Sequence, residues 1–175
     1  DLTIETDEGI AQIAPMKGPW SKLRLIWTKR RAHTPSLVQA VFEFRDKHHK
    51  EYDAIMADIG ATALLGIEAW TEGDSAALIS AMGEAGAALH RLEKGAAVEL
   101  WTEAHTHLAN LASPHGGAVK PTGAGGGDLA WVYFADQDAW TSFETQAIAD
   151  GFVPLTLGID ECGINRQSLV HSSAP

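Results

Sequence analysis

The chain has 175 residues and a mass of 18.7 kDa, the size of one compact domain. Its composition, 45% hydrophobic and 21% charged, is that of a globular protein rather than a disordered one. A formal net charge of −10 disfavours binding to nucleic acid or to a membrane surface, because both present negative phosphates. The single cysteine, Cys162, excludes an internal disulfide and a cysteine-built zinc site, and it agrees with a reducing, cytoplasmic compartment.

The amino-terminal residues are acidic, unlike a signal peptide, and the sequence does not begin with methionine. We therefore expect a processed chain or a piece of something longer. No stretch reaches the roughly 18 uncharged apolar residues of a membrane-spanning helix, since the best candidate, residues 54–67, carries Asp58.

A hairpin, a strand and a series of helices are expected in chain order. Residues 2–13 alternate around Asp7-Glu8-Gly9, which indicates a hairpin, and residues 1–20 could connect to a missing amino-terminal domain. Residues 22–28 predict a strand, and Thr34 is the expected cap of a helix that starts at Pro35. This helix should bury Leu37, Val38, Val41, Phe42 and Phe44.

Apolar side chains then recur every three or four residues up to Pro114, which predicts helices with packing faces. The first stripe runs from Tyr52 to Trp70 and includes Leu64 and Ile67. Gly73-Asp74 should end the first helix and start the second, and Gly95 should end the second helix. A third apolar stripe covers residues 98–111.

Beyond Gly117 the pattern becomes that of strands. Strands are expected at 118–120, 129–134 and 152–157, with a helix capped by Asp136 before the last of them. The side chains that this helix should bury are Trp140, Phe143, Ala147 and Ile148. The order predicts one α+β domain over residues 1–166, with a mostly antiparallel sheet, a helical layer and a flexible tail at 167–175.

Four glycines in five positions mark the loop between two of these strands, Pro121-Thr122-Gly123-Ala124-Gly125-Gly126-Gly127-Asp128. Such a loop offers positive φ angles and bare N–H groups that can close on an anion. It is neither a Walker loop nor a dinucleotide fingerprint, because the Lys-Ser/Thr and the G-x-G-x-x-G spacing are missing. From composition alone, a flexible hairpin connection is an equal alternative.

Histidines and a basic run are the other candidates. His105 and His107 would point about 200° apart on a helix, so they cannot share a metal ion, and all eight histidines are interpreted as surface residues. No metal site is expected. Lys29-Arg30-Arg31 could steer an anion or be a solvated turn.

The segment from Gly117 to Asp128 resembles the third conserved motif of the GHMP small-molecule kinases, in the Lys-Pro-Thr variant typical of the phosphomevalonate kinase branch. Trp27-Thr28, Ala32-His33-Thr34 and Leu37-Val38 are similar to a second stretch of that branch. Lys29 replaces a glycine usual there, and His33 replaces a serine. Together the matches cover about residues 22–160.

The resemblance implies the ferredoxin-like carboxyl-terminal domain of a two-domain kinase with its active site between the domains. By carry-over, Thr122, Gly123 and Ala124 would touch the phosphorylated acceptor, and Gly125, Gly126 and Gly127 would shape the loop. Lys120 and Asp128 would flank it, with Thr34 nearby. The family's ATP-binding motif is absent from these residues, so ATP and Mg²⁺ would bind mainly to a missing amino-terminal half, in the same chain or a second one.

The leading hypothesis is the acceptor-binding part of an ATP-dependent phosphotransferase that acts on a phosphate acceptor in isoprenoid precursor synthesis. Alone it should be inactive, and its catalytic base cannot be assigned. The alternatives are a GHMP kinase for mevalonate, a sugar or homoserine, and a non-catalytic anion-binding module.

Overall fold

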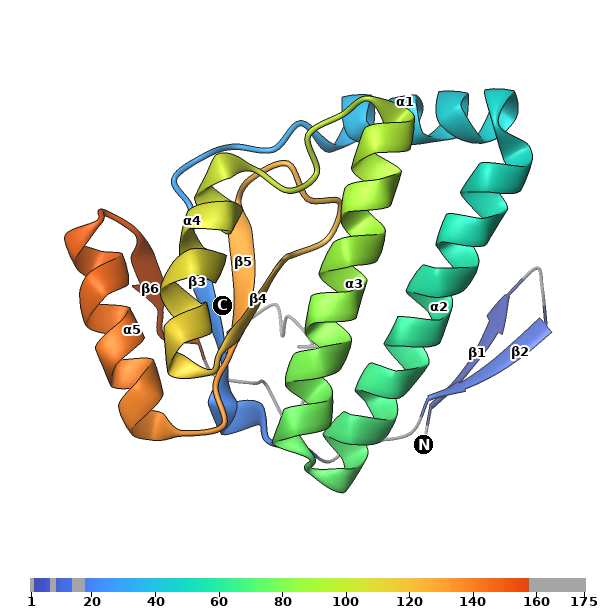
Figure 1. Cartoon of the computed structure of the whole chain (residues 1–175). Coiled ribbons are helices and arrows are strands. Elements are labelled where there is room, and N and C mark those ends of the chain that lie inside the picture. The colour runs from blue at the N-terminus through green and yellow to red at the C-terminus, as the bar shows by residue number, and fades with distance from the viewer. Residues whose placement is uncertain (1, 7–8, 14–17, 158–175) are drawn as a thin grey trace, which may run out of the picture.

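A four-stranded antiparallel sheet organises the chain in the computed structural model, which describes residues 2–6, 9–13 and 18–157 (Figure 1). The sheet contains β3 (Leu23–Trp27), β4 (Ala118–Pro121), β5 (Leu129–Tyr133) and β6 (Val153–Leu155) in the order β4-β5-β3-β6. β1 (Leu2–Thr6) and β2 (Gly9–Ile13) form the expected amino-terminal hairpin. Cys162 and the tail 167–175 lie outside the described residues.

The described residues contain five α-helices, which are α1 (Thr34–Lys47), α2 (His49–Glu72), α3 (Ser75–Ala96), α4 (Glu103–Ala112) and α5 (Gln137–Ala149). The order along the chain is the ferredoxin-like β-α-β-β-α-β, formed by β3, α4, β4, β5, α5 and β6. Helices α1 to α3 are inserted between β3 and α4. The α+β class and the antiparallel sheet are thus confirmed.

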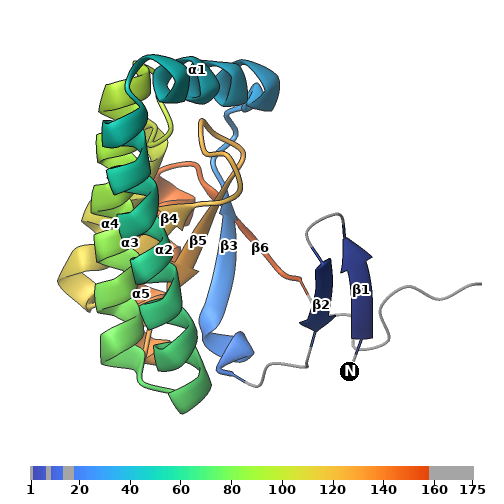
Figure 2. The same ribbon diagram turned by 90° about the vertical axis from the view of Figure 1, so that its right-hand side faces the viewer.

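Helices α4 and α5 cover one face of the sheet (Figure 2). Their apolar residues pack on the alternate strand positions Ile26, Val119, Ala130 and Val132, which are nearly or completely buried. The opposite strand positions include Tyr133, which packs with the end of α2 and the start of α3. A third cluster joins α1, α2 and α3 through Phe44, Ile55 and Leu92.

Helix ends follow the expected capping chemistry with two exceptions. Asp74 and Asp136 cap α3 and α5 as predicted, accepting from the backbone N–H of Ala77 and Ala139. Thr34 was the expected cap of α1 but is its first residue. His33 occupies the cap position, and its Nδ1 lies 2.9 Å from the Ser36 hydroxyl rather than accepting from a backbone N–H of the helix.

Gly95 does not end α3, which runs through it to Ala96. The glycine instead makes room for an aromatic ring, because a Cβ there would lie 2.4 Å from Cζ of Phe44. The expected third stripe also starts too early, since residues 98–102 are not helical and α4 begins at Glu103.

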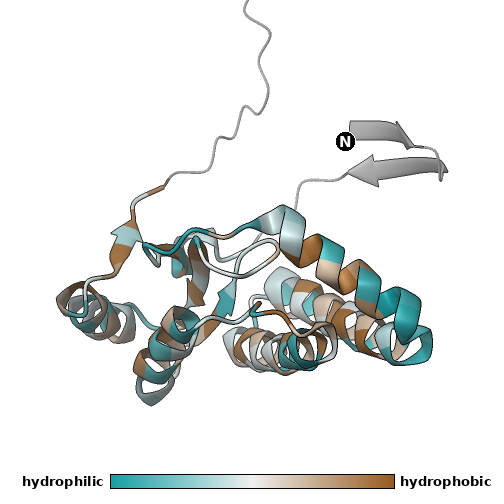
Figure 3. Cartoon of the chain, turned by 90° about the horizontal axis from the view of Figure 1, so that it is seen from above, coloured by the Kyte–Doolittle hydropathy of each residue, from teal (hydrophilic) through white to brown (hydrophobic). Residues whose placement is uncertain are grey.

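Several apolar side chains expected inside are exposed. Val38, Phe42, Leu64, Ile67 and Ile148 have 39 to 69% of their surface in solvent. α2 packs along α3 on one side only, so some of its periodic apolar side chains are left uncovered by any neighbouring element. Figure 3 shows apolar and polar residues mixed along the helices. Within the described residues, α2 is also the one helix whose length and composition would suffice to cross a membrane, although its Asp58 pairs with Arg91 at 2.6 Å.

Candidate functional site

The glycine loop joins β4 to β5 at the end of the sheet where β3 leads into α1 (Figures 1 and 2). Its base is closed by a hydrogen bond from the Thr122 N–H to the Leu129 carbonyl, 3.1 Å, and a tight turn follows from the Gly125 N–H to the Thr122 carbonyl, 3.0 Å. Gly123, Gly125 and Gly126 have φ angles of 52°, 75° and 79°, in the left-handed region that glycine adopts freely.

Two neighbouring segments are hydrogen-bonded to this loop. The Gly126 N–H donates to the Leu100 carbonyl at 2.8 Å, in the connection between α3 and α4. The Asp128 N–H donates to the Arg30 carbonyl at 2.5 Å, and the Asp128 carbonyl accepts from both the backbone and the hydroxyl of Thr28. The loop is therefore tied to the end of β3 and to the start of α4.

Close packing explains three of the glycines. A Cβ would lie 2.4 Å from the Leu100 oxygen at Gly125, 2.6 Å from Cδ1 of Leu37 at Gly126 and 2.6 Å from the Arg30 oxygen at Gly127. Only Gly123, at the exposed tip, faces open space. These short distances indicate a loop with one packed conformation rather than a flexible connection.

Some donors of the loop have no partner among the residues that the structure describes. Among residues 2–6, 9–13 and 18–157, no hydrogen bond is donated by the backbone N–H of Gly123, Ala124 or Gly127, or made by the Thr122 hydroxyl. Backbone N–H groups gathered in a left-handed turn are a common means of binding anions. The loop can thus offer several donors to one negatively charged group.

Lys120 and Asp128 flank the loop as the motif implied. Lys120 is partly buried on β4, where its ammonium group donates to the Pro121 carbonyl at 2.9 Å, and burial lowers the pKa of this ammonium group. Asp128 is exposed and has a φ of 52°. Thr34 lies in the first turn of α1, whose Leu37 would touch a side chain at position 126; the described contacts include none between Thr34 and the loop.

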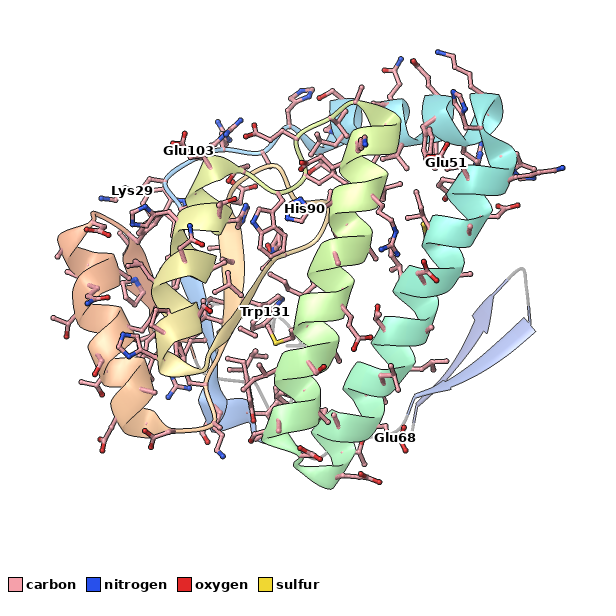
Figure 4. All side chains as sticks on the ribbon, viewed as in Figure 1. Lys29, Glu51, Glu68, His90, Glu103 and Trp131 are labelled. Carbon is pink, nitrogen blue, oxygen red and sulfur yellow. The ribbon has the colours of Figure 1, made fainter. Side chains whose placement is uncertain are left out.

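The three residues of the basic run 29–31 differ in their surroundings. The Arg30 guanidinium pairs with the Glu99 carboxylate across the loop, so its charge is neutralised. Lys29 and Arg31 are exposed, with no ion pair in the described part of the chain, and Lys29 lies at the end of the molecule that also holds Glu103 (Figure 4). Lys29 has a φ of 60°, which explains why glycine suits this position in the resembled family.

Sequence reasoning gave two interpretations of His105, one on the apolar stripe of residues 98–111 and one as a surface histidine. The second is wrong, because His105 is completely buried in the first turn of α4. Its Nδ1 lies 3.2 Å from the Thr102 nitrogen, its Nε2 lies 3.4 Å from the Leu129 oxygen, and burial lowers its pKa below the usual value. The spacing Thr102-x-x-His105 matches a capping box with histidine in place of glutamate, and this signal could have located it.

No group of three or more potential metal ligands occurs among the described residues, and His107 faces away from His105 to pair with Asp150 at 2.6 Å. A separate hollow of about 670 Å³ lies near the start of β3, with Trp20, Arg24 and Trp131 in its lining. It contains none of the expected site residues.

Solved structures provide the comparison with known proteins, since no protein-family model and no curated protein matches the sequence. The chain superposes on Streptococcus pneumoniae phosphomevalonate kinase in complex with phosphomevalonate and AMPPNP with a TM-score of 0.72 and 21% identity, covering 87% of this chain and 43% of that one. The chain thus shares its fold with part of this kinase.

Two further solved structures share the fold. A Listeria innocua protein gives a TM-score of 0.75 at 23% identity, covering 84% of this chain and 41% of that one. L. major mevalonate kinase in complex with R-mevalonate gives 0.66 at 17% identity, covering 80% and 41%. The present chain thus spans about two fifths of the length of these solved chains.

Proposed function

We propose that this chain is the acceptor-binding, carboxyl-terminal part of an ATP-dependent small-molecule kinase resembling phosphomevalonate kinase. The observation that carries the proposal is the glycine loop, whose Gly123, Ala124 and Gly127 N–H groups have no partner among the described residues, in a chain that superposes on a phosphomevalonate kinase. The acceptor would be a small phosphorylated alcohol such as 5-phosphomevalonate, and the compartment would be the cytoplasm.

We propose roles for the loop residues on the basis of their contacts and of the resemblance. The N–H groups of Gly123, Ala124 and Gly127 and the Thr122 hydroxyl would donate to the acceptor, while Gly125 and Gly126 hold the loop against its neighbours. Such donors act by position, because phosphoryl transfer depends mainly on alignment and on charge neutralisation. Lys120 would add positive charge at the base of the loop.

ATP would supply the transferred phosphoryl group, and Mg²⁺ would neutralise its charge. No described residues form a carboxylate cluster suited to the metal, so we assign its binding to an amino-terminal half, in the same chain or in a second one. The present chain by itself should bind the acceptor without turning it over.

Nuclear magnetic resonance on the isotope-labelled chain tests this proposal. Adding 5-phosphomevalonate should shift the amide signals of Gly123, Ala124 and Gly127, and mevalonate at the same concentration should shift them far less. Thr122→Val, which replaces the hydroxyl by a methyl group, should weaken binding about tenfold. Thr145→Val is the matched control, because that hydroxyl bonds only to its own helix, at the Thr141 carbonyl.

Failure of phosphomevalonate to shift the loop signals would refute the proposed acceptor. Binding of mevalonate, a sugar or homoserine instead would identify a kinase domain for another acceptor. Binding of simple anions, together with a natural gene product of only 18.7 kDa and no partner, would leave a non-catalytic anion-binding module.

A further inference from the structure

One buried titratable side chain lies directly behind the glycine loop and has no part in the proposed acceptor contacts. His105 has no exposed surface, whereas the other histidines among the described residues are exposed or partly exposed. Burying an imidazole lowers the stability of the fold unless both ring nitrogens are hydrogen-bonded. Both nitrogens of His105 have them.

The partners define the form of the ring. Two donors of Thr102 point at Nδ1, its backbone N–H at 3.2 Å and its hydroxyl at 2.9 Å. A backbone N–H can only donate, so Nδ1 must be the acceptor and the proton must sit on Nε2. That Nε2–H faces the Leu129 carbonyl at 3.4 Å.

These two contacts lead to two of the hydrogen-bonded anchors of the loop. The Leu129 carbonyl is the same one that accepts from the Thr122 N–H and closes the base of the loop. Thr102 follows two residues after Leu100, whose carbonyl accepts from Gly126. One neutral ring therefore connects the base of the loop to the segment that holds its glycines.

We propose that His105, in its neutral Nε2–H form, is a positioning residue that holds the glycine loop in its anion-binding shape. It does so by joining Thr102 to Leu129 behind the loop. The meaning of this role for acceptor binding rests on the proposed function, but the positioning itself does not.

Protonation of the ring would break the arrangement, because Nδ1–H would then face the Thr102 N–H. The charged groups that act on His105 are Arg30, which lowers its pKa, and Glu99, which raises it; they are paired with each other. His90 approaches only through the Trp101 ring, with centroid separations of 4.9 Å and 6.2 Å along that path. Burial outweighs these influences and favours the neutral form.

Amide hydrogen exchange on the full chain tests the proposal without any ligand. In His105→Leu the ring's hydrogen bonds are lost, and the amides of Thr122 and Gly126 should exchange about tenfold faster. In His105→Gln the side-chain amide keeps one acceptor and one donor and cannot be protonated, so slow exchange should be restored. His107→Gln is the matched control on the same helix, since His107 contacts Asp150 and the Phe152 ring rather than Thr102 or Leu129, and it should leave loop exchange unchanged.

A pH series separates positioning from a simple packing role. The wild-type loop amides should lose protection, corrected for intrinsic exchange, as the pH falls below the ordinary histidine range, and those of His105→Gln should not. If amide exchange at Phe143 in α5 speeds up as much as exchange in the loop of His105→Leu, the substitution destabilises the whole domain. If loop exchange in His105→Leu is unchanged, the ring is not coupled to the loop. Either result overturns the proposal.

Titration with 5-phosphomevalonate then connects the inference to function. His105→Leu should weaken binding and His105→Gln should restore it. If the wild-type chain binds no phosphomevalonate, the proposed function fails while the exchange results still decide the positioning role. If the wild type binds and His105→Leu binds equally well, the positioning role fails alone.

Discussion

Two glycines of one loop should respond very differently to the same substitution. At Gly127 the φ angle is 145°, and an added Cβ would lie 2.6 Å from the Arg30 oxygen and 3.2 Å from the Ala32 nitrogen. At Gly123 the φ angle is 52° and an added Cβ would meet nothing within 4 Å. Gly127→Ala tests packing and backbone strain together, and Gly123→Ala tests strain alone.

The expected costs follow from those distances. A left-handed alanine costs about 1–2 kcal/mol, so Gly123→Ala should lower the free energy of unfolding by about 1 kcal/mol. Gly127→Ala adds a contact with fixed backbone, and relieving it requires a shift of the Asp128–Arg30 hydrogen bond. Overpacking of this kind costs about 1–3 kcal/mol more, for a total of about 2–4 kcal/mol.

Urea unfolding monitored by tryptophan fluorescence measures both variants. The midpoint should fall clearly further for Gly127→Ala than for Gly123→Ala, with the slope unchanged. Equal losses in the two variants would refute the close approach of Gly127 to β3 and with it the tied form of the loop.

Three further substitutions and a pH series test other features. Lys29→Gly should stabilise the chain by about 0.5–1 kcal/mol in thermal unfolding, because lysine at a φ of 60° is strained, and no gain would argue against that backbone. Ala97→Gly, at the left-handed C-cap of α3, should do the same far from the basic run. Glu99→Gln should cost less than about 1 kcal/mol at low salt and nothing at 1 M salt, since its pair with Arg30 is half exposed; a larger loss would mean a buried pair. The folded pKa of His105 lies below its unfolded value of about 6.5, so its contribution is complete above pH 6.5 and is lost as the pH falls toward the folded pKa. The pH profile of His105→Gln should lack this decline, and identical profiles would refute it.

Much of the fold was open to sequence reasoning because its signals are local. Asp74 and Asp136 predict the starts of α3 and α5, because an aspartate side chain can accept a hydrogen bond from the first turn of a helix. The run 129–133 predicts a strand, because it is apolar, rich in aromatic residues and bounded by polar ones. The glycine motif predicted both the loop and, through resemblance, the ferredoxin-like domain that the solved kinases share.

Burial was the part that local pattern could not decide. Leu64 and Ile67 have helical spacing, but whether they are covered depends on which other element reaches α2, and α3 reaches only one side. Gly95 shows the reverse case: it looked like a helix end, but the ring of Phe44 from another helix is what requires a glycine there.

The candidate site divides along the same line. The sequence alone determined that residues 122–127 form a glycine loop flanked by Lys120 and Asp128, because residue type and order are sufficient for that motif. Only the tertiary structure decided that Leu100 and Arg30 tie the loop down and that His105 lies buried behind it. Those contacts join residues far apart in the chain, such as His105 and Leu129, and no local pattern encodes which distant carbonyl a nitrogen will meet.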